Sequence, residues 1–84
     1  MRGTRYEIAS ERRDMSVSSW TLVFQEVVGM WVVERHWNIF DSTLGMAVDT
    51  GTERQSIEAF EVSRTGRRFI KQLRDALDKA KRDA

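Results

Sequence analysis

With 84 residues, the chain has room for one small hydrophobic core, because a domain of this size buries only about 60 to 65% of the surface that its unfolded form exposes. The absence of cysteine excludes disulfides and thiolate metal sites, which leaves self-association as the expected extra source of stability. With 14 basic and 13 acidic side chains, the net charge of +1 gives the whole chain no strong field for nucleic acid or a membrane.

The charge is unevenly distributed along the sequence. Residues 64–84 carry eight basic side chains against three Asp, a local charge of +5. Residues 1–63 carry six basic and ten acidic side chains, a local charge of −4. The two parts are therefore expected to attract each other.

The start of the sequence lacks the apolar stretch of a signal peptide. No later run approaches the roughly 20 apolar residues that a membrane span needs. Together with the missing cysteines, these features favour a cytoplasmic protein that does not enter a membrane.

The first two thirds of the sequence predict strands. Tyr6 and Ile8 alternate with polar neighbours and indicate a strand over about 5–10. The stretch that follows is rich in Val, Trp, Phe and Ile and has no Pro, which predicts a hairpin with strands over 17–27 and 30–40.

The register of this hairpin follows if Val28 and Gly29 form a two-residue turn. Trp20 then faces Trp37, and one face of the hairpin collects most of the large apolar side chains. This predicted core face comprises Trp20, Leu22, Phe24, Trp31, Val33, Trp37 and Ile39, with Arg35 as the exception in its middle.

The rest of the sequence predicts a shorter strand and a long helix. Residues 46–49 indicate a fourth strand after a turn at Asp41–Gly45, and 56–62 fits either a helix or an edge strand. Over 64–82 the apolar residues share one arc of a helix, with Ser63 or Thr65 as its N-cap. Gly66 is expected to weaken the first turn of this helix. The prediction is one α+β domain over 1–84, with a sheet of three to four antiparallel strands built on a central hairpin and packed by the C-terminal helix.

One short motif resembles a catalytic site. Asp49-Thr50-Gly51, after apolar Ala47 and Val48, resembles the active-site triplet of the aspartic proteases. The resemblance implies a dimer in which two such carboxylates share a proton. The dimeric retroviral type also has a flap hairpin after the triplet, and only about a dozen residues separate Gly51 from the predicted helix. We therefore interpret the triplet as a polar turn whose side chains bond nearby backbone amides.

No other pattern in the sequence indicates catalysis, a cofactor or a metal. His36 is the only histidine and is predicted to lie on the polar face of the hairpin. The acidic residues lack the spacing of a calcium loop, and the five glycines are too far apart to form a phosphate-binding loop. We therefore predict no enzyme and no small-molecule substrate.

A basic cluster marks the start of the last helix, where the helix dipole disfavours positive charge by about 0.3 to 1 kcal/mol per residue. Its members are Arg64, Arg67, Arg68, Lys71 and Arg74. Either acidic side chains of this chain (Glu53, Glu58, Glu61 or those of the sheet) compensate the cluster, or it binds an anionic partner. We favour compensation within the chain.

The second face of the hairpin is apolar for a face expected to be exposed. Val23, Val27, Met30 and Val32 lie on it, beside Glu34. These five residues predict a protein-interaction module (a regulator, adaptor or inhibitor) that contacts another protein or a second copy of itself. The alternative is a nucleic-acid-binding regulator that uses the basic cluster, assisted by Arg5, Arg12 and Arg13.

Overall fold

The computed structural model describes residues 4–41 and 43–83. Four antiparallel strands form one sheet in the order of the sequence: β1 (Arg5–Arg13), β2 (Ser16–Gln25), β3 (Met30–Asp41) and β4 (Met46–Ser56). Three helices follow: α1 (Ile57–Val62), α2 (Arg64–Arg68) and α3 (Ile70–Arg82). The predicted α+β class, with an antiparallel sheet and a C-terminal helix, is confirmed.

Two strands are longer than predicted, and one ambiguity is resolved. β1 continues through the polar segment to Arg13, and β4 reaches Ser56 instead of ending near residue 49. The segment 56–62 is helical because the Ser56 hydroxyl accepts a hydrogen bond from the Ala59 N–H and so caps α1.

The turn between β2 and β3 differs from the prediction. Gln25 pairs with Met30, so the turn has four residues, and Trp20 lies opposite Arg35 instead of Trp37. Gly29 ends this turn with a positive φ of 67° and donates its N–H to the carbonyl of Gln25. A two-residue turn would require a left-handed conformation at Val28, which a β-branched residue resists.

The predicted assignment of side chains to the two faces is still correct, because the predicted register differs from the observed one by two residues, an even number. Leu22 faces Val33 and Phe24 faces Trp31, with all four side chains on the predicted core face.

The turn after β3 is closed in the same way as the turn after β2, because Gly45 donates its N–H to the carbonyl of Asp41.

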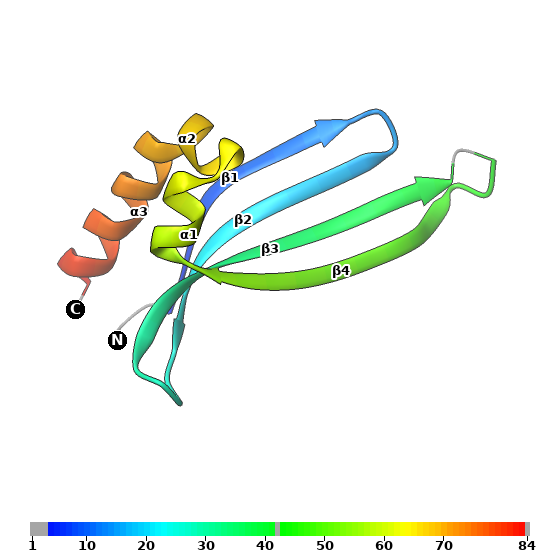
Figure 1. The fold of residues 1–84 in the computed structure, drawn as a ribbon. Coiled ribbons are helices and arrows are strands. Elements are labelled where there is room, and N and C mark those ends of the chain that lie inside the picture. The colour runs from blue at the N-terminus through cyan, green and yellow to red at the C-terminus, as the bar shows by residue number, and fades with distance from the viewer. Residues whose placement is uncertain (1–3, 42, 84) are drawn as a thin grey trace.

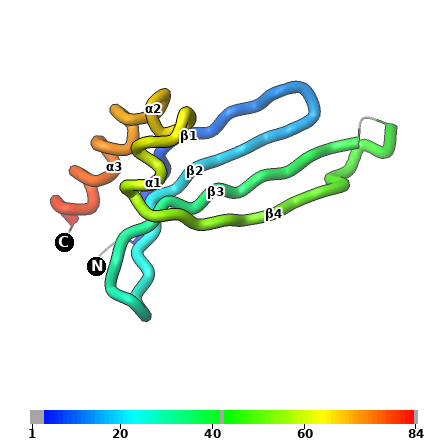
Figure 2. The backbone as a smooth tube through the Cα atoms, viewed as in Figure 1, coloured from blue at the N-terminus to red at the C-terminus, as the bar shows by residue number. Residues whose placement is uncertain are grey.

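The helices cover only one end of one face of the sheet (Figure 1). The core lies at this end. It consists of Ile8, Trp20, Leu22 and Val33 from the sheet and Phe60, Leu73, Ala76 and Ala80 from the helices. The β1–β2 and β3–β4 hairpins extend well beyond the helices, which gives the molecule a longest dimension of 45 Å (Figure 2).

The predicted helix over 64–82 is divided into α2 and α3 at Phe69, whose φ of −110° and ψ of 23° are not helical. The break places the Phe69 ring 5.3 Å from the centre of the Trp20 ring. Among the described residues, none of the helices has the length and apolar composition needed to cross a membrane.

Ser63 and Gly66 connect α1 to α2. The Ser63 hydroxyl donates to the carbonyl of Phe60 and accepts from the N–H of Gly66, so Ser63 is the N-cap that one of the two sequence alternatives predicted. Gly66 is buried, and a Cβ atom on it would lie 1.6 Å from the Phe60 carbonyl oxygen. The glycine is therefore required by close packing, at the expense of helix propensity.

We expect Gly66→Ala to lower the free energy of unfolding by about 1 to 3 kcal/mol, because the added methyl group must push α1 and α2 apart. Helix propensity alone predicts the opposite, a gain of about 1 kcal/mol. Urea unfolding followed by tryptophan fluorescence measures the difference. Gln72→Ala, at an exposed position of α3, serves as the control and should change stability by no more than a few tenths of a kcal/mol. A Gly66→Ala variant as stable as the parent would contradict the packing explanation.

Candidate functional site

An open groove of about 440 Å³ lies where the sheet emerges from beneath the helices. Three arginines, Arg13, Arg35 and Arg68, reach it from β1, β3 and α2, together with the carboxylates Glu11 and Glu53. Its remaining polar wall includes the hydroxyl groups of Ser16, Ser18, Ser63 and Thr65. The groove thus combines three cations with two anions.

Strand register explains why these side chains meet. Glu11 lies opposite Ser18, which lies opposite Trp37. In a neighbouring row of residues paired across the strands, Arg35 on β3 lies opposite Trp20 on β2 and Glu53 on β4. Both rows belong to the face that the helices cover further along, because side chains two residues apart on a strand share a face.

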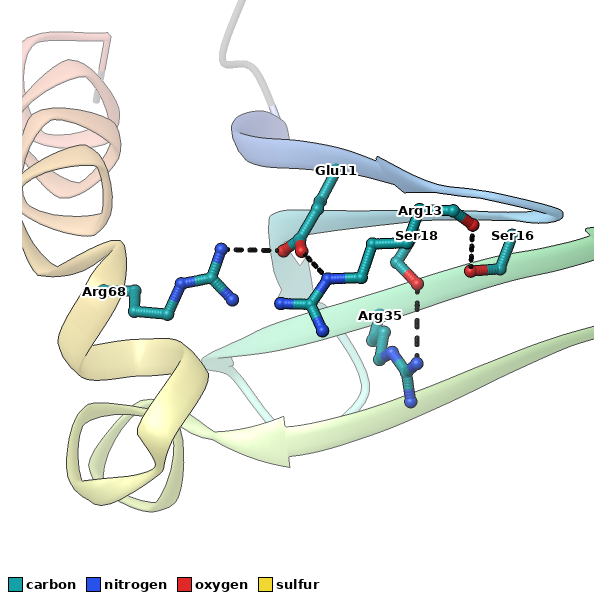
Figure 3. A network of polar contacts seen from close by, with 6 residues as sticks. All are labelled: Glu11, Arg13, Ser16, Ser18, Arg35 and Arg68. Atoms are coloured by element: carbon teal, nitrogen blue, oxygen red, sulfur yellow. Dashed lines mark hydrogen bonds and ion pairs between the residues drawn. The ribbon is translucent and has the colours of Figure 1, made fainter.

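Glu11 ties the β1–β2 hairpin to α2 (Figure 3). Its carboxylate accepts a hydrogen bond from Arg13 and lies 2.9 Å from the Arg68 guanidinium, 57 positions away in the sequence. The hydrogen bond from Arg13, and then that from Arg68, hold the pKa of Glu11 below its ordinary value. Glu11 therefore stays ionised and paired.

Arg35 occupies the middle of the groove. Its Nη1 lies 3.6 Å from a Glu53 carboxylate oxygen, and its Nη2 donates to the Ser18 hydroxyl over 3.4 Å (Figure 3). The guanidinium lies 5.1 Å from the centre of the Trp37 ring, within the range of a cation–π contact. Its Nε is buried without a hydrogen-bond partner among the described residues.

Asp49-Thr50-Gly51 lies within β4, so its interpretation as a polar turn is wrong. The Trp37 ring covers Gly51 so closely that a Cβ atom there would lie 2.1 Å from the ring. Trp37 also donates its indole N–H to Asp49 over 3.4 Å, and Thr50 donates its hydroxyl to the Trp37 carbonyl. The triplet therefore accommodates one aromatic side chain of the neighbouring strand.

Two of the four apolar residues predicted to be exposed on the second face are buried. Val23 is only 5% exposed and Val32 only 7%, whereas Val27 and Met30 are exposed near the turn. Glu34, 8% exposed, accepts hydrogen bonds from Arg5 at 2.6 Å and from Arg54 at 2.9 Å.

The arginine pair explains this burial. Arg5 lies opposite Val23 on β1, so its side chain must cross β2 at that position to reach Glu34 on β3. The apolar stem of a long basic side chain covers the surface that it crosses. The prediction that Val23 and Val32 form an exposed contact surface with Glu34 is therefore wrong, because all three residues are buried where Arg5 and Arg54 converge on the Glu34 carboxylate.

The basic cluster is exposed and mostly uncompensated. Arg68 pairs with Glu11, an acidic residue of the sheet, so compensation within the chain is confirmed for this one member. Within residues 4–41 and 43–83, no carboxylate lies within 4.0 Å of the other basic groups of the cluster. These four are Arg64, Arg67, Lys71 and Arg74, all exposed.

Two of the groove's central residues, Glu11 and Arg35, were not predicted as site residues, although the sequence contains a signal for each. Glu11 and Arg13 are two positions apart, which places them on the same face once the strand is extended to residue 13. Arg35 was the one charged side chain within an apolar face. A charge at such a position indicates a place where the cover over the sheet ends.

His36 is exposed, and its Nδ1 lies 3.1 Å from the Thr52 hydroxyl. In the described part of the chain, no three side chains of the types His, Cys, Asp and Glu gather as a metal site would require.

A scan against protein-family models, a search of curated proteins and a search of solved structures found no match to this chain. Its function is therefore inferred from geometry.

We expect Glu34→Gln to lower the free energy of unfolding at pH 7 by about 1 to 3 kcal/mol, because Arg5 and Arg54 lose their shared carboxylate. The hydrogen bond from Arg5, and then that from Arg54, hold the pKa of Glu34 below its ordinary value. Its contribution to stability is therefore complete above the ordinary glutamate pKa of about 4.3 and is lost as the pH falls through the lowered pKa. Urea unfolding from pH 7 to pH 3 checks both statements.

Glu7→Gln provides the control, since Glu7 is exposed on the same face and its neutralisation should change little at any pH. The difference between Glu34→Gln and the parent should shrink toward pH 3. A difference that stays constant with pH would contradict the role of the Glu34 charge.

Proposed function

We propose that the protein is a non-enzymatic protein-interaction module, of the regulator, adaptor or inhibitor kind, that works as a homodimer. The observation that supports this most directly is the length of the sheet. The helices cover one end of one face, whereas the β1–β2 and β3–β4 hairpins extend past them with no helix on either side (Figure 1). A sheet of this size needs a packed face for stability, and a partner can supply it.

Apolar side chains gather on this uncovered half. Five large ones are exposed near its far end: Met15 in the β1–β2 turn, Leu44 in the β3–β4 turn, and Ile39, Met46 and Val48 on β3 and β4. A backbone hydrogen bond from Phe40 to Met15 brings the first turn against β3. Exposed apolar groups concentrated in one region favour contact with another protein.

The groove supports binding in preference to catalysis. A general acid at neutral pH needs a raised pKa, whereas the arginines around Glu11 lower it. The Glu53 carboxylate lies 3.6 Å from Arg35. These carboxylates are placed to hold the hairpin, β3 and α2 in a fixed arrangement, and that arrangement presents the uncovered half of the sheet.

The homodimer is tested by light scattering over a range of concentrations. We expect a mass of twice the 9.8 kDa of one chain. Val48→Glu, at a residue that is 55% exposed on the uncovered half, should weaken association by about tenfold or more, equivalent to roughly 1.4 kcal/mol. Val62→Glu introduces the same change at a 69% exposed residue of α1 and should leave the mass unchanged. A monomer at every concentration would overturn the proposal.

A second candidate function is nucleic-acid binding, and the uncompensated part of the basic cluster favours it. Arg64 and Arg67 lie on α2. Ser63, just before Arg64, and Thr65, just after it, line the groove. The arginines of the groove thus continue onto the exposed side of the helices. A row of cations without carboxylate partners fits a phosphate backbone.

Fluorescence anisotropy with a labelled single-stranded oligonucleotide tests this candidate. We expect affinity to fall steeply with salt, and Arg67→Glu to weaken binding at least about tenfold and to reduce the salt slope by about 1. Arg82→Glu makes the same charge change at the far end of α3 and should have a much smaller effect. Absence of binding at low salt would exclude this function.

A further inference from the structure

We infer that the free edge of β4 is the dimer contact, pairing antiparallel with β4 of a second copy in a register centred on Thr52. The two sheets would then join into one continuous sheet. This inference rests on the proposed homodimer and identifies the surface that forms it.

β4 is the less protected of the two edges of the sheet. The strand order leaves β1 and β4 at the edges, and α3 packs against β1. β4 contacts β3 and, near its end, α1. Its 11 residues include neither Pro nor Lys, which commonly block pairing at an edge. Its outer backbone groups are therefore available to another strand.

Symmetry restricts how two copies of β4 can pair. Opposed residues of an antiparallel pair lie on the same face of the sheet, and side chains alternate between faces along a strand. Under a two-fold axis perpendicular to the sheet, the central residue must therefore lie opposite its own copy. Each allowed register is thus named by one central residue of β4.

Charge excludes most of these registers. A register centred on Asp49, Glu53 or Arg54 places that charged residue opposite its own copy. A centre at Gly51 places Asp49 opposite Glu53 of the second copy, twice. Like charges directly opposite each other destabilise a strand pair. Registers centred nearer either end of β4 would pair too few residues. Two registers therefore remain, one centred on Thr50 and one centred on Thr52.

The bulge in β4 decides between these two. The pairing of β4 with β3 shifts between Ala47 and Asp49, whereas from Asp49 to Ser56 it is regular. A register centred on Thr50 would extend from Met46 to Arg54 and cross the bulge, which interrupts a ladder of hydrogen bonds. With Thr52 at the centre, the pairs from Asp49 to Gln55 all lie in the regular part.

The side chains complement each other in the Thr52 register. Asp49 lies opposite Gln55 of the second copy, whose amide can donate to the carboxylate. Arg54 lies opposite Thr50, and Glu53 lies opposite Gly51, so no like charges face each other. A second copy satisfies both free edges at once through two equivalent sets of these pairs, and therefore we assign it as the occupant of this edge.

Cysteine cross-linking tests the register, because the chain has no cysteine of its own. In Thr52→Cys the two thiols would face each other with Cβ atoms about 4.5 to 5.5 Å apart, close enough for a disulfide after a small adjustment. Mild oxidation should convert most of this variant to a covalent dimer. In Thr50→Cys the two thiols would lie four residues apart along the strands, about 13 Å, and should not cross-link.

The two variants are matched controls for each other. Both residues are exposed threonines of β4, and each loses one hydroxyl hydrogen bond, Thr52 to His36 and Thr50 to the Trp37 carbonyl. Nitroxide labels on the introduced thiols of the same two variants give a second measurement, with the shorter separation expected for Thr52→Cys. Circular dichroism confirms that both variants are folded.

The outcomes separate this inference from the proposed function. Cross-linking of Thr50→Cys without cross-linking of Thr52→Cys would overturn the Thr52 register. A dimer in light scattering that cross-links in neither variant would overturn the β4 contact and leave the homodimer intact. A monomer in light scattering would overturn the homodimer itself.

Discussion

The structure depends on the burial of one end of the sheet beneath the helices. Leu22 and Val33, paired across β2 and β3, are completely buried, as are Phe60 and Leu73 from the helices. This small core has no disulfide to reinforce it. The three short helices fold back on one another at Ser63 and Phe69, so they cover one end of the sheet instead of extending along it.

The arginine network lies at the boundary where this cover ends. Glu11 and Arg68 connect β1 to α2, and Arg35 spans the middle of the sheet between Ser18 and Glu53. On the opposite face, where no helix packs, Arg5 and Arg54 converge on Glu34, beside the buried Val23 and Val32. Long basic side chains thus protect apolar surface on both faces because their stems are apolar and their charged ends can find carboxylates.

The uncovered half of the sheet is where the proposed function resides. Its strands are held to the rest of the molecule by backbone pairing and by the groove's ion pairs, so the surface that it offers is largely preformed. A preformed surface loses little conformational entropy on binding. The regular part of β4, which runs from this half to the covered end of the sheet, offers backbone hydrogen bonds as well as side chains, and both contribute to strand pairing between chains.

The sequence alone predicted the class of the fold and the face on which each side chain of the central hairpin lies. It did so because alternation along a strand and the apolar arc of a helix are local patterns that burial enforces wherever the strand or helix packs. The pairing register of the hairpin does not follow from these patterns, because the length of its turn is set by the hydrogen bond from the Gly29 N–H back to the Gln25 carbonyl.

Features that depend on residues far apart in the sequence are visible only in the folded chain. Gly66 is required because the Phe60 carbonyl occupies the space of its Cβ atom, and Gly51 because the Trp37 ring does. Val23 is buried because Arg5 reaches across it to Glu34, 29 positions away. Local patterns carry no information about such contacts, because each is set by the register between strands and by where the helices stop covering the sheet.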